Sequence, residues 1–172
     1  MSIAAIKETT QYLSFTLSDE VFAVDVARVR EILEFKGTTR IPQVPEYMRG
    51  VINLRGSVVP VIDLRLLFGL TRTESTINTC VIVLEIAIED DTIVVGALAD
   101  SVREVLELEP TEVEPAPSIG TKLNTDFIKG MGKHNEQFLM LLDIDKLLND
   151  DTMGTIRKAS GTTADISMQE AA

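Results

Sequence analysis

The sequence predicts a mainly β protein made of two small, similar lobes. Most of its periodic segments are short and rich in Val, Ile, Leu and Phe, which is typical of strands. Several of these segments are paired across short turns, and the second half repeats the order of the first. With 172 residues and 45% apolar content, the chain can bury a substantial core.

The first predicted element is a hairpin, with residues 11–17 and 20–24 alternating around Ser18-Asp19. In residues 26–33 the apolar positions recur at helical spacing. This segment is so short that a helix running into a strand fits it equally well.

The next elements are set by proline and glycine. Pro42 and Pro45 predict a loop, and residues 46–49 predict one helical turn ended by Gly50. The elements expected after it are strands at 50–55 and 57–62, a short helix at 64–68 and a loop at 70–77.

Two long strands are predicted at 79–88 and 92–98, on either side of the acidic turn 89–91. Residues 106–118 contain four glutamates and three prolines, so we expect an extended connector there. A second hairpin and an Asp-led helix follow and end near residue 150. The tail, residues 151–172, is expected to begin helical and then become disordered.

An internal repeat supports the two-lobe prediction. Val29-Arg30-Glu31-Ile32-Leu33 matches Val102-Arg103-Glu104-Val105-Leu106 at an offset of 73. At an offset of 80, Gly50 falls on Gly130 and Asp63 on Asp143. We therefore expect one domain over 1–150, with two intertwined lobes at about 20–80 and at 12–19 plus 81–150.

Each lobe is expected to curl into a small closed barrel, because strands this short do not make a stable flat sheet and a barrel hides its edges. Two barrels side by side would leave a groove between them.

The two halves differ at one turn. The first half has Asn53-Leu54-Arg55-Gly56, whereas the second has Lys133-His134-Asn135-Glu136 and so no arginine. A guanidinium beside a core strand needs a carboxylate, and Glu31 is a candidate on the same lobe. The pair could be a purely structural ion pair, or it could orient a partner-binding surface.

Charge argues against two classes of partner. The net charge is -11, which repels phosphate backbones and anionic lipid, so we expect neither nucleic acid nor direct membrane binding. One cysteine, Cys80, and the lack of an 18-residue apolar stretch predict a reduced, cytoplasmic protein.

Catalysis, metal and cofactor binding find little support. The single histidine, His134, is expected to be exposed in a turn, and no serine or cysteine is spaced to use it as a base. The acidic strings 89–91 and Asp143-x-Asp145 lack the glycine and glutamate of a calcium loop, so a solvated turn and a helix cap are expected instead. Gly130-Met131-Gly132 lacks the third glycine of a dinucleotide loop.

Several ordered blocks resemble the CheW family of bacterial chemotaxis adaptors. They are Ile41-Pro42, Gly50, Asn53-Leu54-Arg55-Gly56 and Pro60 to Asp63-Leu64, with further agreement from about Gln11 to Leu148. The resemblance implies two five-stranded SH3-like barrels around a shared core, no catalytic activity and no cofactor. It also implies two partners, the cytoplasmic tips of chemoreceptors and the regulatory domain of the histidine kinase CheA.

The resemblance also implies which residues bind. The receptor tip, a helical hairpin, would lie in the groove between the lobes, with Arg55 bracing Glu31 beside it. The positions that match the receptor groove are Val29, Glu31, Gly50, Gly56, Gly96, Val102 and Val105. Exposed apolar residues near Ile41 and Val44 are the candidate kinase contact.

The implied function is a cytoplasmic scaffold that holds receptors and kinase in one array. A CheW-like adaptor of a surface-motility or developmental pathway is an alternative, as is a small β-barrel enzyme or ligand-binding protein. An enclosed polar pocket holding His134 and two carboxylates would favour that last class.

Overall fold

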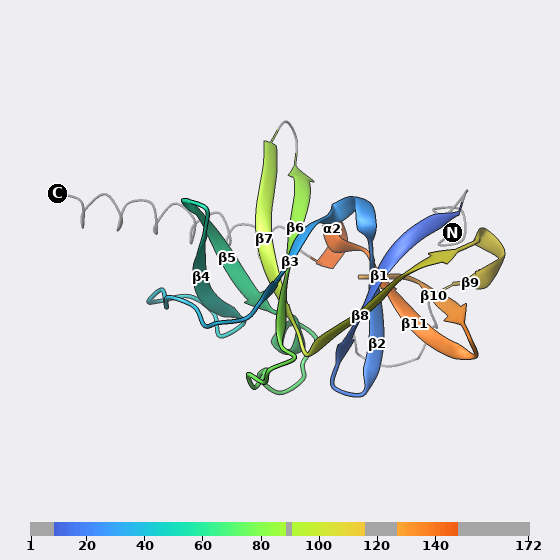
Figure 1. Cartoon of the computed structure of the whole chain (residues 1–172), viewed down its shortest axis with the longest axis horizontal. Helices are drawn as coiled ribbons and strands as arrows, with labels where there is room; N and C mark the ends of the chain where they lie inside the picture. The colour runs from blue at the N-terminus through green and yellow to red at the C-terminus, as the bar shows by residue number, and fades with distance from the viewer. Residues whose placement is uncertain (1–8, 89–90, 116–126, 148–172) are drawn as a thin grey trace.

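The computed structural model describes residues 9–88, 91–115 and 127–147, which form two β-sheets packed side by side (Figure 1). The six-stranded sheet has the order β8-β1-β2-β11-β10-β9, and the five-stranded sheet has the order β3-β6-β7-β5-β4. The prediction of a mainly β chain with two lobes is confirmed.

The bounds of the elements are as follows. The six-stranded sheet contains β1 (Thr10–Leu17), β2 (Glu20–Asp25), β8 (Ser101–Leu108), β9 (Val113–Glu114), β10 (Ile128–His134) and β11 (Gln137–Leu142). The five-stranded sheet contains β3 (Val29–Glu34), β4 (Met48–Leu54), β5 (Ser57–Asp63), β6 (Cys80–Ile88) and β7 (Asp91–Ala99). The short helices are η2 (Val26–Arg28), α1 (Leu64–Leu67), η3 (Pro110–Glu112) and α2 (Ile144–Leu147).

The two halves of the sequence exchange their first hairpins. The blue hairpin β1–β2 lies among the yellow and orange strands of the second half, while β6–β7 lies with β3, β4 and β5 (Figure 1). The sheets therefore divide the chain differently from the predicted lobe ranges, which separated β2 from β1 and placed β6 and β7 in the second lobe. Each hairpin stays whole because its two strands pair with each other over most of their length.

The repeat is visible in the strand register. The parallel pairing of β5 with β7 sets Val61 opposite Gly96, and that of β11 with β2 sets Leu141 opposite Ala23. Leu141 lies 80 residues after Val61, and Gly96 lies 73 after Ala23, so both sequence offsets recur in one structural equivalence. The two lobes are thus related by an approximate two-fold repeat.

A matched pair of glycines allows a close strand crossing in each lobe. The register shifts between Met48 and Gly50 in β4, and between Ile128 and Gly130 in β10. A Cβ on Gly50 would overlap the Thr39 carbonyl, and one on Gly130 would lie 2.9 Å from Val113. Gly50 also has a φ of +141°, a conformation that side chains rarely adopt.

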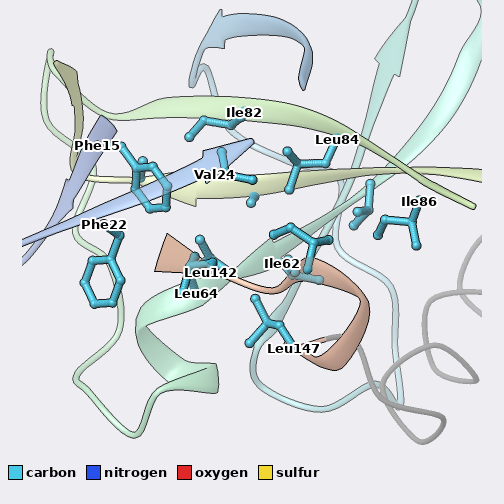
Figure 2. Packing of buried hydrophobic residues seen from close by; sticks show 14 of the residues in the cluster. Phe15, Phe22, Val24, Ile62, Leu64, Ile82, Leu84, Ile86, Leu142 and Leu147 are labelled. Atoms are coloured by element: carbon cyan, nitrogen blue, oxygen red, sulfur yellow. The ribbon is translucent and has the colours of Figure 1, made fainter. Parts of the chain in front are cut away.

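The core is shared between the two sheets. Side chains from strands of both sheets, from α1 and from α2 form one apolar cluster, in which Phe15, Phe22, Ile62, Leu64, Ile82, Leu142 and Leu147 pack together (Figure 2). Stacked rings extend it, because Phe22 lies 5.2 Å from Phe68 and Phe68 lies 4.7 Å from Phe127 between ring centroids. Each barrel also has a smaller cluster of its own.

Residues 26–33 form the short helix η2 followed by the strand β3, which is one of the two predicted alternatives. Two other predicted elements differ from the structure. The predicted helical turn at 46–49 is wrong: the chain turns at Pro45, whose carbonyl accepts from the Met48 amide, and β4 begins at Met48. The predicted connector at 106–118 is wrong as far as Glu114, because Leu106, Leu108 and Val113 are buried in β8 and β9; residues 116–118 lie outside the described residues.

Substitution of Gly50 should destabilise the fold strongly. Gly50→Ala adds a Cβ that overlaps the Thr39 carbonyl at a φ reserved for glycine. We expect its free energy of unfolding to fall by about 3 kcal/mol, at the upper end of the range for one strained residue. Gly37→Ala is the matched control, because its φ of +102° is also positive but no atom lies within 4 Å of the added Cβ; it should lose only about 1 kcal/mol. Equal losses in urea titrations would show that the crossing at Thr39 is not the constraint.

Candidate functional site

Two equivalent strands, β3 and β8, border the shared core. Val29 in β3 lies opposite Leu84, and Val102 in β8 lies opposite Phe15. Directly opposed residues of antiparallel strands point to the same face, and Leu84 and Phe15 both belong to the shared core. The half-buried Val29, from the first half of the chain, and Val102, from the second, both pack against that core.

Further along each strand, one apolar side chain on the same face is exposed to solvent. Ile32 lies opposite Ile82 and is 42% exposed, while Val105 lies opposite Leu13 and is 54% exposed. Ile32 was not among the predicted site residues, although the offset of 73 that maps Val29 onto Val102 also maps Ile32 onto Val105. We call Val29, Ile32, Val102 and Val105 the β3–β8 rim.

The predicted partnership of Arg55 with Glu31 is present in the structure. The two terminal guanidinium nitrogens of Arg55 donate to the Glu31 carboxylate: Nη1 to Oε1 at 3.2 Å, and Nη2 to Oε2. Arg55 has a φ of +51° and Gly56 a φ of +87°, and the Gly56 amide donates to Asn53 Oδ1 at 2.8 Å. The turn is therefore held by its own asparagine, which presents the arginine to β3.

The pair is exposed to solvent mainly on the side of its arginine. The side chain of Arg55 is 69% exposed and that of Glu31 is 23% exposed. The hydrogen bonds from Arg55 lower the pKa of Glu31 against the opposing effect of burial, so the carboxylate remains ionised at neutral pH. A partly exposed ion pair of this kind adds little to the stability of the fold. Its position between two strands is therefore more informative about the site than its energy.

The pair spans an open seam in the barrel. β3 and β4 are the two edge strands of the five-stranded sheet, and a pocket of about 560 Å³ lies between them. Most residues that line this pocket belong to the segments 32–39 and 51–54. The Thr39–Val51 bridge joins these two segments at one end, and the Glu31–Arg55 pair joins them at the other. The ion pair thus joins two strands that no ladder of backbone hydrogen bonds connects.

The predicted receptor-groove glycines are not on the rim. Gly96 is buried in β7, where a Cβ would lie 2.7 Å from Val81, and Gly50 is buried against Thr39. Gly56 is exposed in the turn that carries Arg55. The structure therefore brings Val29, Glu31, Val102 and Val105 to the surface around the core, and gives Gly50 and Gly96 the role of close packing.

The surface of the candidate kinase contact is formed by other residues than the two predicted. Ile41 is buried and Val44 is half-buried, and both pack into the shared core, so the expectation of exposed apolar residues is wrong there. Their loop lines a pocket of about 460 Å³, at which the exposed groups include Pro42, Arg40 and Arg72.

A buried ion pair near this pocket was not predicted. Asp63 is fully buried and accepts from Arg49 at 3.1 Å, from the Thr73 amide at 3.0 Å and from the Thr73 hydroxyl at 2.7 Å. It also accepts from the Arg65 amide and so begins α1. The available signal was a basic residue, Arg49, directly before Gly50 in an apolar segment.

Other candidate sites carry no chemistry in the described part of the chain. His134 is the last residue of β10, half-buried and opposite Gln137, so the expected exposed turn histidine is wrong. Asp143 caps α2 by accepting from the Lys146 amide at 3.2 Å, as predicted, while residues 89–90 of the acidic turn lie outside the described residues. Over 9–88, 91–115 and 127–147, no cluster of three or more His, Cys, Asp or Glu could hold a metal ion. No helix within these ranges is long and apolar enough to cross a membrane.

The two capping aspartates allow a matched stability prediction. Asp63→Ala leaves Arg49 largely buried without its partner, so we expect a loss of about 3–5 kcal/mol in the free energy of unfolding. Asp143→Ala, 80 residues later, removes only an accessible helix cap and should cost about 1 kcal/mol. Denaturant titrations of both variants compare them directly, and similar losses would contradict the structural role given to the Arg49–Asp63 pair.

Comparison with known proteins identifies close similarity over most of the chain. The protein-family model for the CheW-like domain matches residues 11–152. Chemotaxis protein CheW of Klebsiella aerogenes is 38% identical over 85% of this chain and 86% of its own length. Chemotaxis protein CheW of Bacillus subtilis is 35% identical over 87% of this chain and 93% of its own length. Among solved structures, the scaffolding protein TtCheW of Thermoanaerobacter tengcongensis superposes with a TM-score of 0.73 and 29% identity, covering 83% of this chain and 90% of that one.

Proposed function

Because the chain belongs to the CheW-like family, we propose that it is a non-catalytic adaptor that couples the cytoplasmic tips of chemoreceptors to the histidine kinase CheA. The observation that carries the proposal is the family match over residues 11–152, together with relatives named as chemotaxis and scaffolding proteins. A cytoplasmic location at receptor arrays is part of the same proposal.

The receptor tip is assigned to the β3–β8 rim and the adjoining turn. Ile32 and Val105 offer exposed apolar side chains, which suit the apolar face of a helix. Glu31 and Arg55 add a charged pair and Gly56 a small residue at the same edge strand, on the face of β3 opposite to that of Ile32. In this assignment Gly50 and Gly96 act indirectly, by letting the strands behind the surface pack closely.

The kinase regulatory domain is assigned to the loop that contains Ile41 and Val44. These two side chains face inward, so they would support the loop, while Arg40, Pro42 and Arg72 would make the contact. The first surface spans β3 and β8, whereas the second is the loop before β4. Receptor state could then alter kinase output only if the adaptor binds the two receptor states with different affinities.

Reconstitution tests the proposed function. Receptor, kinase and the phosphate-accepting response regulator are combined with and without this chain, and kinase autophosphorylation is followed. We expect receptor-dependent activity only when the chain is present. The absence of coupling, together with no binding to either receptor or kinase, would refute the adaptor function.

Substitutions at the ion pair should weaken receptor coupling as one unit. Glu31→Ala and Arg55→Ala each leave the other member without its partner across the seam. We expect both to lower receptor affinity, and the double variant to lose little more than either single variant. Glu85→Ala is the control, because it breaks another exposed ion pair of the same sheet, with Arg30, and should leave receptor affinity unchanged. Additive losses with an unchanged fold would show that Glu31 and Arg55 act separately.

Loss of one apolar side chain from the rim should affect binding more than folding. Ile32→Ser removes a partly exposed apolar group and should reduce receptor affinity by about three- to eight-fold, as expected for burying the 42% of this isoleucine that is exposed in the free protein. Ile77→Ser removes an isoleucine that is 97% exposed in the loop before β6, and it should leave receptor affinity unchanged. Calorimetric titration with a receptor fragment measures both, and equal affinities would remove Ile32 from the proposed contact.

A further inference from the structure

Along the described residues, the chain passes between its two sheets at two points. β2 of the six-stranded sheet leads to β3 of the five-stranded sheet through η2, and β7 leads back to β8 through the single residue Asp100. The strands that begin directly after these crossings are the two that carry the β3–β8 rim. Val29 is the first residue of β3, and Val102 is the second of β8. Whatever holds the crossings therefore sets where both rim strands begin.

An ion pair holds the crossing from β7 to β8. The Asp100 carboxylate accepts from Arg65 Nη1 at 3.2 Å and from the Ser18 amide at 2.7 Å. Arg65 belongs to α1, which follows β5 of the five-stranded sheet, whereas Ser18 lies in the turn between β1 and β2 of the other sheet. The Asp100 amide also donates to the Thr16 carbonyl at 2.9 Å. One carboxylate thus ties this crossing to both sheets.

The crossing from β2 to β3 is held by an ion pair in the equivalent place. Arg28, the last residue of η2, donates to Asp145 of α2 at 2.8 Å. Asp145 lies 80 residues after Arg65, and Arg28 lies 72 residues before Asp100, within one residue of the repeat offset of 73. The charges are exchanged, since α1 supplies the cation of its pair and α2 the anion. We call the Arg65–Asp100 and Arg28–Asp145 pairs the crossing clamps.

The two crossing clamps differ in exposure. The side chains of Arg65 and Asp100 are 19% and 24% exposed, whereas those of Arg28 and Asp145 are 35% and 51% exposed. Solvent screens the Arg65–Asp100 clamp less, so we expect it to restrain its crossing more strongly. Arg65 is also held on its other side, because its Nη2 donates to Thr71 Oγ1 at 3.1 Å.

The shared core holds the two sheets together, but apolar attraction is non-directional, whereas hydrogen-bonded ion pairs have preferred distances and angles. We propose that the crossing clamps, and Arg65 with Asp100 above all, are positioning residues that set the distance between β3 and β8. They thereby adjust the fit of the receptor tip to the β3–β8 rim without contacting it. This role rests on the proposed function, because receptor binding is the property that the clamps adjust.

Distances between the two rim strands in the free chain test this role. Nitroxides are placed at Glu34→Cys and Glu107→Cys in a Cys80→Ser background. Glu34 and Glu107 are exposed, lie on β3 and β8, and are 73 residues apart, so they occupy equivalent places. Pulsed electron–electron double resonance gives the distribution of distances between the labels. Calorimetric titration of the unlabelled chains with a soluble chemoreceptor tip fragment gives the receptor affinity.

Two variants open the Arg65–Asp100 clamp. Arg65→Met removes its donors at a similar side-chain length, and Asp100→Asn removes its charge but keeps an acceptor for the Ser18 amide. Glu85→Gln is the matched control, because it opens the Arg30–Glu85 pair, which lies within the five-stranded sheet. Circular dichroism confirms that each variant is folded, and Asp100→Asn decides the question if Arg65→Met does not fold.

The parent chain and Glu85→Gln should give the same single, narrow distance and the same receptor affinity. Both clamp variants should give a broader distribution or a second distance. Receptor affinity should fall with the population that keeps the parent distance, because apparent affinity scales with the fraction of molecules competent to bind. A fall of that population to about a fifth corresponds to an affinity loss of about five-fold.

An unchanged distance distribution in the folded clamp variants would overturn the positioning role while leaving the proposed function intact. A changed distribution with unchanged receptor affinity would also overturn it, because the spacing of the rim strands would then not matter to the receptor tip. No binding of the fragment by the parent chain would refute the receptor-binding function, and the positioning role with it.

Discussion

The exchange of hairpins between the two halves of the chain is the constraint on which the rest of the structure depends. Because β1–β2 pairs with strands of the second half and β6–β7 with strands of the first, neither half can complete its sheet alone. The shared core follows directly, since the exchanged strands bring Phe15, Phe22 and Ile82 to one cluster between the sheets. The stacked rings from Phe22 through Phe68 to Phe127 then tie segments of both halves together. The two lobes consequently form one cooperative unit rather than two domains joined by a linker.

Two ion pairs of the five-stranded sheet differ in burial, and this difference suits one of them to stabilise the fold and the other to contact a partner. The Arg49–Asp63 pair is nearly dry and completed by Thr73, so each member depends on the other and the pair anchors β4, α1 and the loop before β6. The Arg55–Glu31 pair is more exposed, and such a pair contributes little to folding, yet it spans the seam between β3 and β4, the edge strands of this sheet. The exposed guanidinium of Arg55 makes the pair available to a partner at the edge of the sheet.

Sequence periodicity located most strands but could not assign their partners. The hairpins at 11–24, 50–62 and 79–98 were predictable because each alternates around a short turn. The partnership of Glu31 with Arg55 was also predictable, since a fixed cation beside a strand requires a carboxylate. The start of β4 at Met48 was missed because residues 46–49 are followed by Gly50, a residue typical of helix ends, whereas the hydrogen bond from the Met48 amide to the Pro45 carbonyl closes a turn instead. Burial of Leu106, Leu108 and Val113 was obscured by the glutamates and prolines among them.

The sequence by itself determined the mainly β class, the two-fold repeat and the family, because alternation, turn residues and ordered blocks are local properties of the chain. Only the tertiary structure decided that the halves exchange hairpins, that Ile41 and Val44 face inward, and that Ile32 joins Val105 at the surface. A strand's pattern shows that one of its faces is buried but not against what, since its neighbours are chosen by contacts between residues far apart in the chain. The repeat in the sequence predicted the equivalence of β3 and β8, and the fold showed that Val29 and Val102 pack against the same core.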